Sequence, residues 1–426
     1  MIGHDPKSQG PHFISRRAFV LGIGASLLLG STGFPKFARA QNRPIKVGII
    51  LPEQGPFSQD SKSLVAGFEC CLKEKGPSGI QVIRRDPGSK DEKTLEILAQ
   101  MLVVDKVDFV ISPMSLDGAE KTVHGVSDSS AVLFVTNPSV KLVAGELCQS
   151  RSFRVRPNTY QRSSPLAPWA IQNLGRLAFI TGPRDKEGNE TADFFAYSFD
   201  RSGGTFGDRV MVPVGSDNFR SVLDAIEKTK NDVIFAGFGK KDALGFFKAI
   251  ESRKHRPWLK RIVGPDSLVS YPAGAAALGK AADGVKTLGC VKNPSDFAQR
   301  IRKTVGVDVP DIERAAEGYD IASIVHLSVK GVSWDSQTPA LPLIEYIENL
   351  SVEGPRGVIT FDKNHEPVVD MAIREWSVST HGLQPKTVQD IKGVRSLDFG
   401  CGKVGFPQRP SGETKEEGPL WEDLEE

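Results

Sequence analysis

The 426-residue chain has little of what usually marks a metalloprotein or an enzyme. Its five cysteines include no Cys-x-x-Cys pair, which argues against a zinc site or a thioredoxin-type redox site. Its seven histidines are scattered, and no Gly-x-Ser-x-Gly elbow is present to expose a nucleophile. We therefore predict a protein with no metal, no cofactor and no catalytic residues.

Net charge and composition also limit the classes of protein and of partner that the sequence allows. The net charge of +2 gives no reason to expect nucleic acid as a partner. Charged residues make up 25% and apolar residues 39% of the chain, which is ordinary for a soluble protein, and the length allows two or three domains.

Two stretches resemble binding motifs but lack residues that those motifs require. Residues 237–241 lack the spacing of a phosphate-binding loop, and Pro367 stands where a calcium loop beginning at Asp362 needs glycine.

The first 40 residues have the pattern of an export signal. Arg16 and Arg17 precede a weakly apolar region at residues 21–29, and residues 38–40 (Ala-Arg-Ala) have the small-x-small pattern of a cleavage site. The apolar region is too short for a membrane span, which needs about 20 residues. The paired arginines resemble a twin-arginine signal, with an ordinary secretory signal as the alternative. We expect a periplasmic protein that begins near Gln41 and has the twin-arginine export machinery as a partner.

From residue 45 onward, the pattern predicts alternating strands and helices. The apolar run at residues 45–51 predicts a buried strand, and Leu64, Phe68 and Leu72 recur after it at helical spacing. Further strands are expected at residues 81–84, 108–111 and 131–135, with helices at 90–106 and from about 117. This alternation is typical of an α/β fold with a parallel sheet.

The same rhythm restarts after Pro157. Strands are expected at residues 177–180, 209–214, 232–236 and 261–264, with helices at 190–201 and 219–228. Helices at 295–304 and 312–330 fit a return to the first half, and residues 358–361 and 368–376 fit an antiparallel pair. The chain therefore has two halves of similar architecture.

Polar loops follow three strands of the first half, at residues 54–58, 112–115 and 136–137. Because the carboxyl ends of parallel strands meet at one edge of a sheet, we expect these loops to lie together. Their hydroxyls and free amides can hold a small polar or anionic group. For each residue alone, capping of the following helix is an equally good explanation.

An ordered set of motifs carries a family resemblance. Residues 45–69 come first, followed by Thr-Asn-Pro at 136–138, Phe-Arg-Val-Arg-Pro at 153–157, Gly-Pro-Asp at 264–266, Gly-Tyr-Asp at 318–320 and residues 354–362. In this order the chain resembles the periplasmic substrate-binding proteins of branched-chain amino acid-type ABC transporters. The resemblance implies an α/β fold of two Rossmann-like lobes with parallel sheets, joined by three hinge crossings (the type I periplasmic binding fold). It also implies capture of a small polar, amino acid-like or aromatic ligand between the lobes and delivery to a membrane ABC permease.

The resemblance divides the chain into segments. Residues 41–157 and 290–355 are expected in lobe I, and residues 158–289 and 356–384 in lobe II, with crossings near Pro157, Cys290 and Pro355. Residues 385–426 form a C-terminal extension outside the resemblance. Its acidic end, residues 412–426, is expected to be disordered.

The resemblance also implies which residues contact a ligand. A carboxylate would be held by Ser115 and Thr136, and an ammonium group would pair with Asp266, which otherwise serves as a helix cap. The full set of candidate ligand-binding residues is Ser115, Thr136, Asn137, Asp266, Phe57 and Phe238.

Some features leave alternatives open. Residues 182–190 contain no aromatic side chain, and Pro113 and Met114 replace a run of small hydroxyl residues, which weakens the case for a leucine-like ligand. A ligand sensor of the same fold and an exported enzyme are the alternative functions. A disulfide between Cys148 and Cys290 is also open, because both lie near expected crossings in an oxidising compartment.

Overall fold

The computed structural model describes residues 43–397 and 399, except for 77–78, 254–255 and 333–339, and these residues belong to one compact unit. The expected export signal at residues 1–40 and the acidic segment at residues 412–426 lie outside the described residues. None of the described helices is both long enough and apolar enough to cross a membrane.

The first half of the chain builds a five-stranded sheet in which every strand is parallel to its neighbours, in the order β2-β1-β3-β4-β5. The strands are β1 (Ile45–Ile50), β2 (Ile80–Arg85), β3 (Phe109–Ile111), β4 (Val132–Val135) and β5 (Ser152–Arg154). The predicted strands β1 to β4 are confirmed, whereas β5 was not predicted. Between them lie α1 (Ser58–Lys75), α2 (Thr94–Ala99), the π-helical η1 (Gln100–Asp105), α3 (Leu116–Val126) and the short 3-10 helix η2 (Val140–Leu142).

The second sheet has nine strands, with β14 added beside β13 to the order β11-β12-β13-β10-β9-β8-β6-β7. Strands β6 to β10 are parallel, and β11 to β14 pair antiparallel. Their bounds are β6 (Leu177–Pro183), β7 (Thr205–Val212), β8 (Val233–Ala236), β9 (Ile262–Gly264), β10 (Lys286–Gly289), β11 (Val352–Gly354), β12 (Gly357–Phe361), β13 (Pro367–Ser379) and β14 (Gly382–Val394). The fold is thus α/β with one parallel and one mixed sheet, and the expected β12–β13 pair is confirmed.

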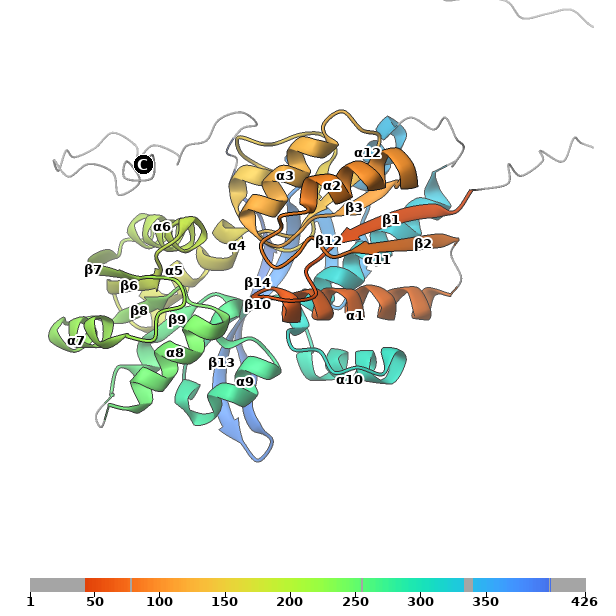
Figure 1. The fold of residues 1–426 in the computed structure, drawn as a ribbon. Coiled ribbons are helices and arrows are strands. Elements are labelled where there is room, and N and C mark those ends of the chain that lie inside the picture. The colour runs from red at the N-terminus through yellow and green to blue at the C-terminus, as the bar shows by residue number, and fades with distance from the viewer. Residues whose placement is uncertain (1–42, 77–78, 254–255, 333–339, 398, 400–426) are drawn as a thin grey trace, which may run out of the picture. The chain divides into compact units, whose positions relative to one another are not determined.

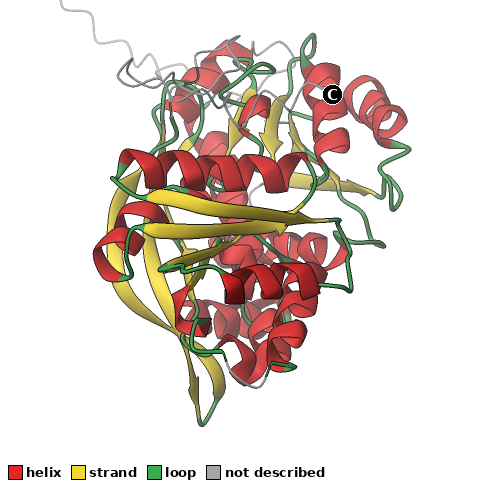
Figure 2. Ribbon diagram, turned by 90° about the vertical axis from the view of Figure 1, so that its left-hand side faces the viewer, coloured by secondary structure: helices red, strands yellow, loops and turns green. Residues whose placement is uncertain are grey.

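The β14 strand was missed in the sequence, and its composition explains why. Most of its residues are exposed and polar, so no apolar alternation indicates a strand. It forms because β13 offers a long edge, and the register runs from Gly382 opposite Ser379 to Val394 opposite Val369. Figures 1 and 2 show the tip of this hairpin projecting beyond the neighbouring helices.

The remaining helices connect and cover these strands. They are α4 (Thr159–Ser163), α5 (Leu166–Asn173), α6 (Lys186–Arg201), α7 (Arg220–Lys228), α8 (Lys240–Glu251), α9 (Ala273–Leu278), α10 (Pro294–Val305), α11 (Ile312–Gly331) and α12 (Ala340–Glu348), with short 3-10 turns η3 (Leu259–Arg261), η4 (Asp266–Val269) and η5 (Gly279–Ala282). Helices α10 and α11 pack on α1, which follows the first strand of the first half.

The segment before β13 ties the two halves together. The Arg154 guanidinium of β5 lies 3.1 Å from the Glu366 carboxylate, and both side chains are buried. The backbone N–H of Arg154 also donates to the carbonyl of His365.

Cys290 is a free, buried thiol, so the Cys148–Cys290 disulfide left open by the sequence is not formed.

Helices α1 and α11 approach each other closely because glycine occupies both sides of the contact (Figure 1). A Cβ at Gly67 would lie 1.7 Å from the Ala315 carbonyl oxygen, and one at Gly318 would lie 1.9 Å from the Leu64 carbonyl oxygen. No side chain fits in either place. This contact fixes the first turn of α11 relative to the start of α1, where the residues described below lie.

Substitution Gly67→Ala is expected to lower the free energy of unfolding by about 1–3 kcal/mol, because the added methyl group forces the two backbones apart. Gly207→Ala is the matched control, since a Cβ there meets nothing closer than 3.6 Å. Urea denaturation of both variants measures the difference. Equal stability of the two would contradict the proposed role of the close approach.

Candidate binding cleft

A cavity of about 180 Å³ lies where the carboxyl ends of strands from both sheets meet. Met114 follows β3, Pro183 ends β6, Gly237 follows β8 and Pro265 follows β9, and each of them lines the cavity. The starts of α1 and α11 complete the lining. A larger cavity of about 620 Å³ lies at the amino end of β8, but residues 226–261 alone line it. The smaller cavity is the better candidate for a functional site because both halves of the chain supply charged groups to it.

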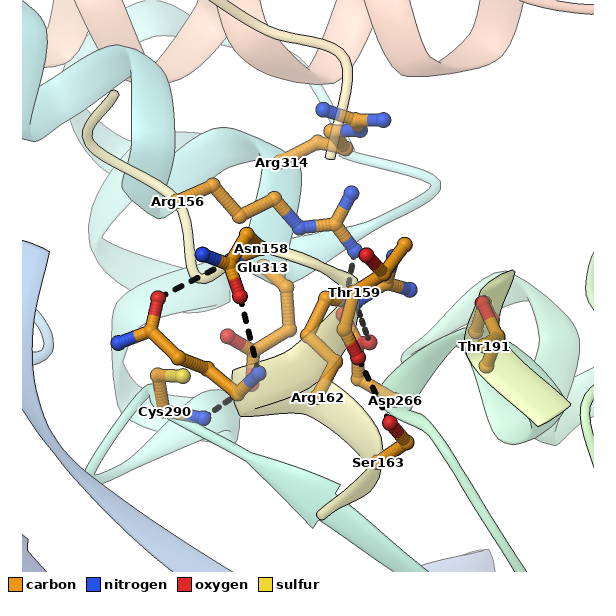
Figure 3. Close-up of polar contacts among 12 residues, drawn as sticks. Arg156, Asn158, Thr159, Arg162, Ser163, Thr191, Asp266, Cys290, Glu313 and Arg314 are labelled. Atoms are coloured by element: carbon orange, nitrogen blue, oxygen red, sulfur yellow. Dashed lines mark hydrogen bonds and ion pairs between the residues drawn. The ribbon is translucent and has the colours of Figure 1, made fainter. Parts of the chain in front are cut away.

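Three arginines from different segments reach this cavity. Arg156 precedes α4, Arg162 belongs to α4, and Arg314 lies in the first turn of α11. Each is at most 6% exposed. Figure 3 shows the guanidinium groups of Arg156 and Arg314 close together, near the pair formed by Arg162 and Asp266. The floor of the cavity therefore concentrates buried positive charge.

The carboxylate of Asp266 binds two of these arginines. Its Oδ2 accepts from Nη2 of Arg156, and its Oδ1 accepts from Nε of Arg162 at 2.7 Å (Figure 3). Burial favours the neutral acid, but the two guanidinium groups outweigh it and hold the pKa of Asp266 well below its usual range. Asp266 therefore stays ionised, with both oxygens occupied by the protein.

Arg314 and Lys240 extend the charged network across the cavity. Arg314 Nη1 donates to the Thr136 carbonyl at 2.9 Å and to Glu317 Oε2 at 2.8 Å. Lys240, at the start of α8, forms an ion pair of 2.7 Å with Asp60 of α1. Its ammonium group also lies 4.0 Å from the centre of the Phe57 ring. These contacts join a helix beside the first sheet to a helix beside the second.

Asp311 is a further charged group of the lining. Its Oδ1 caps α11 by accepting from the backbone N–H groups of Glu313 and Arg314. Burial and the nearby charge of Asp60 raise the pKa of Asp311 to about 6, although Arg156 opposes the shift. At pH 7 this carboxyl group is therefore mostly ionised, and it takes up a proton as the pH falls through about 6. Within the described part of the chain, no cluster of His, Cys, Asp or Glu side chains is arranged to hold a metal ion.

The hydroxyl and amide groups predicted as ligand contacts form hydrogen bonds with the backbone in this structure. Ser115 caps α3 by accepting from the Gly118 N–H at 3.0 Å. The Thr136 hydroxyl lies within hydrogen-bond distance of the carbonyls of Ser112 and Pro113. The structure places these groups near the cavity but outside its lining.

The other predicted residues divide between cavity and core. Asn137 donates to the Met114 carbonyl and lies outside the lining. Phe238 is fully buried against other aromatic rings. The centre of its ring lies 5.4 Å from the ring centre of Phe219 and 5.0 Å from that of Phe246. Phe57 lines the cavity, and Asp266 lies directly behind two arginines that do.

The three arginines that line the cavity were not predicted from the sequence. Arg156 stands within one of the motifs that carried the resemblance, but its charge was not interpreted as part of a site. Arg162 and Arg314 lie more than 150 residues apart and belong to no local motif. Arg156 and Arg162 lie close to the crossing expected near Pro157, and this position is the signal in the sequence that could have indicated them.

Three comparisons with known proteins agree with this architecture. Residues 44–382 match the family model described as periplasmic binding protein. A Leu/Ile/Val-binding protein homolog 6 from Brucella suis is 22% identical over 331 residues, which are 75% of this chain and 83% of that protein.

Two solved structures share the fold. An ABC transporter substrate-binding protein from Sphaerobacter thermophilus has a TM-score of 0.75 at 20% identity, covering 84% of this chain and all of that one. A solute-binding protein from Rhodopseudomonas palustris, solved with 3,4-dihydroxybenzoic acid, has a TM-score of 0.72 at 21% identity, covering 82% of this chain and 98% of that one.

Substitution Asp266→Asn is expected to lower the free energy of unfolding at pH 7 by about 3 kcal/mol, because it leaves two buried guanidinium groups without their anion. The contribution of Asp266 is fully present above its unfolded-state pKa of ~3.9 and is lost as the pH falls toward its lower folded-state value. Urea denaturation at pH 7 measures the effect, with Asp208→Asn, an exposed position in β7, as the control. An unchanged stability of Asp266→Asn would show that the ion pairs are not formed.

Proposed function

Because this chain belongs to the periplasmic binding protein family, we propose that it is an extracytoplasmic solute-binding protein. It binds a small polar, amino acid-like or aromatic solute in the cleft between α1, α8 and α11 and delivers it to an ABC transporter permease. The observation that carries this proposal is the cavity whose charged lining comes from both sheets. Its volume of about 180 Å³ is below the ~300–1,000 Å³ of pockets for drug-sized ligands, which favours a small solute.

The names of the similar proteins support a transport role. They describe a Leu/Ile/Val-binding homolog and a transporter protein that binds an aromatic acid. The export-signal pattern of residues 1–40 supports delivery of the chain to the periplasm through the twin-arginine machinery. Binding without chemical conversion then accounts for a site made of ion pairs and helix termini.

Closure of the cleft is the mechanism that the contacts favour. A ligand held by groups from both halves of the chain stabilises the closed arrangement, because in the open arrangement the ligand contacts the groups of one half alone. The Lys240–Asp60 ion pair spans the cleft in the same way. Lys240 has a φ of 51°, a left-handed value that is costly for a residue with a side chain and that is found more often at ligand clamps and switch regions. We infer that this pair is a contact of the closed state.

Lys240→Met is expected to weaken ligand binding about two- to tenfold, since the Lys240 side chain is 42% exposed and its ion pair is partly screened. The methionine side chain keeps the apolar contact with Phe57. Lys241→Met, at the adjacent exposed position, should leave the affinity unchanged. Calorimetric titration measures both, and an equal loss in the two variants would argue against a closing role for Lys240.

A thermal-shift screen of amino acids, amides and small organic acids tests solute binding. A ligand at 100 times its dissociation constant should stabilise the protein by about 2.7 kcal/mol. Uptake of the same radiolabelled ligand by cells that lack the gene, with and without the restored gene, tests delivery. Tight binding without any dependence of uptake on the gene would contradict a transport role.

A further inference from the structure

The three arginines of the cleft carry more hydrogen-bond donors than the protein uses. A guanidinium group has five N–H donors. The protein engages Nη2 of Arg156, Nε of Arg162 and Nη1 of Arg314. Within the described residues, Nε and Nη1 of Arg156, both Nη atoms of Arg162, and Nε and Nη2 of Arg314 form no hydrogen bond. Of these atoms within the described residues, Arg314 Nε is the one that is fully buried without a partner, which is costly unless a ligand or a shift of the side chain satisfies it. The other free N–H groups are accessible from the cavity, where a ligand can accept from them.

Two carboxylates close to these arginines do not accept hydrogen bonds from the free N–H groups. The Glu187 carboxylate lies 4.0 Å from Nη1 of Arg162, and the Asp60 carboxylate lies 3.7 Å from Nε of Arg314. Both distances are too long for hydrogen bonds. Glu187 is also 40% exposed, so water competes for it. The deep part of the cavity therefore offers donors that lack acceptors.

The acidic groups in the same region are already engaged. Both oxygens of Asp266 accept from arginines, Asp60 pairs with Lys240, and Asp311 caps α11. The other acids of the lining, Asp185, Glu187 and Asp242, are exposed or half-buried, so water competes for them. An ammonium group entering the floor of the cleft would meet cations before it met a free carboxylate.

The balance of charge favours a singly charged ligand. The lining holds the cations Arg156, Arg162, Arg314 and Lys240. It also holds the acids Asp60, Asp185, Glu187, Asp242 and Asp311, and the arginines are further paired with Asp266 and Glu317. A planar carboxylate matches the fork of a guanidinium group with two parallel hydrogen bonds. A phosphate dianion would bring excess negative charge beside these acids. Phe57, Met114, Pro183 and Pro265 supply an apolar wall for a small hydrocarbon body.

We propose that the ligand is a small organic acid whose carboxylate binds to the free N–H groups of Arg156, Arg162 and Arg314, and that an α-ammonium group is not required. This inference rests on the proposed solute-binding function and narrows its ligand class. It assigns Asp266 a positioning role, in place of the ammonium contact expected from the sequence.

Matched ligands test the inference on the unaltered protein. Calorimetric titrations compare 4-methylpentanoate with leucine and with leucinamide, which share one carbon skeleton, and 3,4-dihydroxybenzoate with its amide. At least one acid should bind about 30-fold or more tightly than its amide, and 4-methylpentanoate should bind at least as well as leucine. An amide that binds as tightly as its acid, or a leucine that binds much more tightly than 4-methylpentanoate, overturns the inference. So does an inorganic phosphate or sulfate that binds more tightly than every acid.

Arg314→Lys provides the second test, because it keeps the charge but removes the planar fork. It should weaken binding of the preferred acid at least tenfold and leave amide binding unchanged, whereas Lys241→Gln, the surface control, should change neither. Full retention of acid affinity in Arg314→Lys contradicts the assigned contact. Binding of a neutral solute, with uptake that depends on the gene, would refute the carboxylate proposal and leave the solute-binding function standing. Failure of every compound to bind, with no dependence of uptake, would remove both.

Discussion

The ion pairs of Asp266 with Arg156 and Arg162 are the contacts on which the cleft depends. Removing three charged groups from water costs several kcal/mol for each, and only mutual attraction with good hydrogen-bond geometry offsets that cost. Asp266 meets the condition by accepting from both guanidinium groups, which keeps its pKa low and its charge in place. It leaves the outer N–H groups of the arginines directed to the cavity. The Asp266 carboxylate thus holds two arginines in the positions from which they can bind the carboxylate of a ligand.

Backbone packing positions the opposite side of the cleft. The glycines of the α1–α11 contact bring the first turn of α11 against the start of α1, so that Arg314 and Asp311 lie near Asp60. Asp60 in turn pairs with Lys240 of α8. Stability and binding therefore use the same elements. A change that separates the two helices should disturb the charges of the cleft before it disturbs either sheet.

The fold was largely predictable from the sequence, because buried parallel strands such as β1, β4 and β8 are continuous apolar runs between turn signals. The exposed β14 and the short β5 were not predictable, since their pairing comes from neighbouring strands. For the site, its position at the carboxyl ends of the strands was predictable, whereas the hydrogen bonds and ion pairs of its side chains were not. Ser115 and Thr136 have hydroxyls that either cap the backbone or bind a ligand, and the backbone uses them. Arg314 and Arg156 come to line the same cavity through folding alone, so no spacing in the chain indicates that they share a site.

Binding of an acid in a cleft prepared by arginines is the central claim. A crystal structure of the protein with its preferred acid tests it most directly. The account predicts a carboxylate within about 3 Å of free guanidinium nitrogens of Arg156, Arg162 and Arg314, with Asp266 still bound to both of its arginines. A ligand seated elsewhere, or one whose ammonium group has displaced an arginine from Asp266, would contradict it.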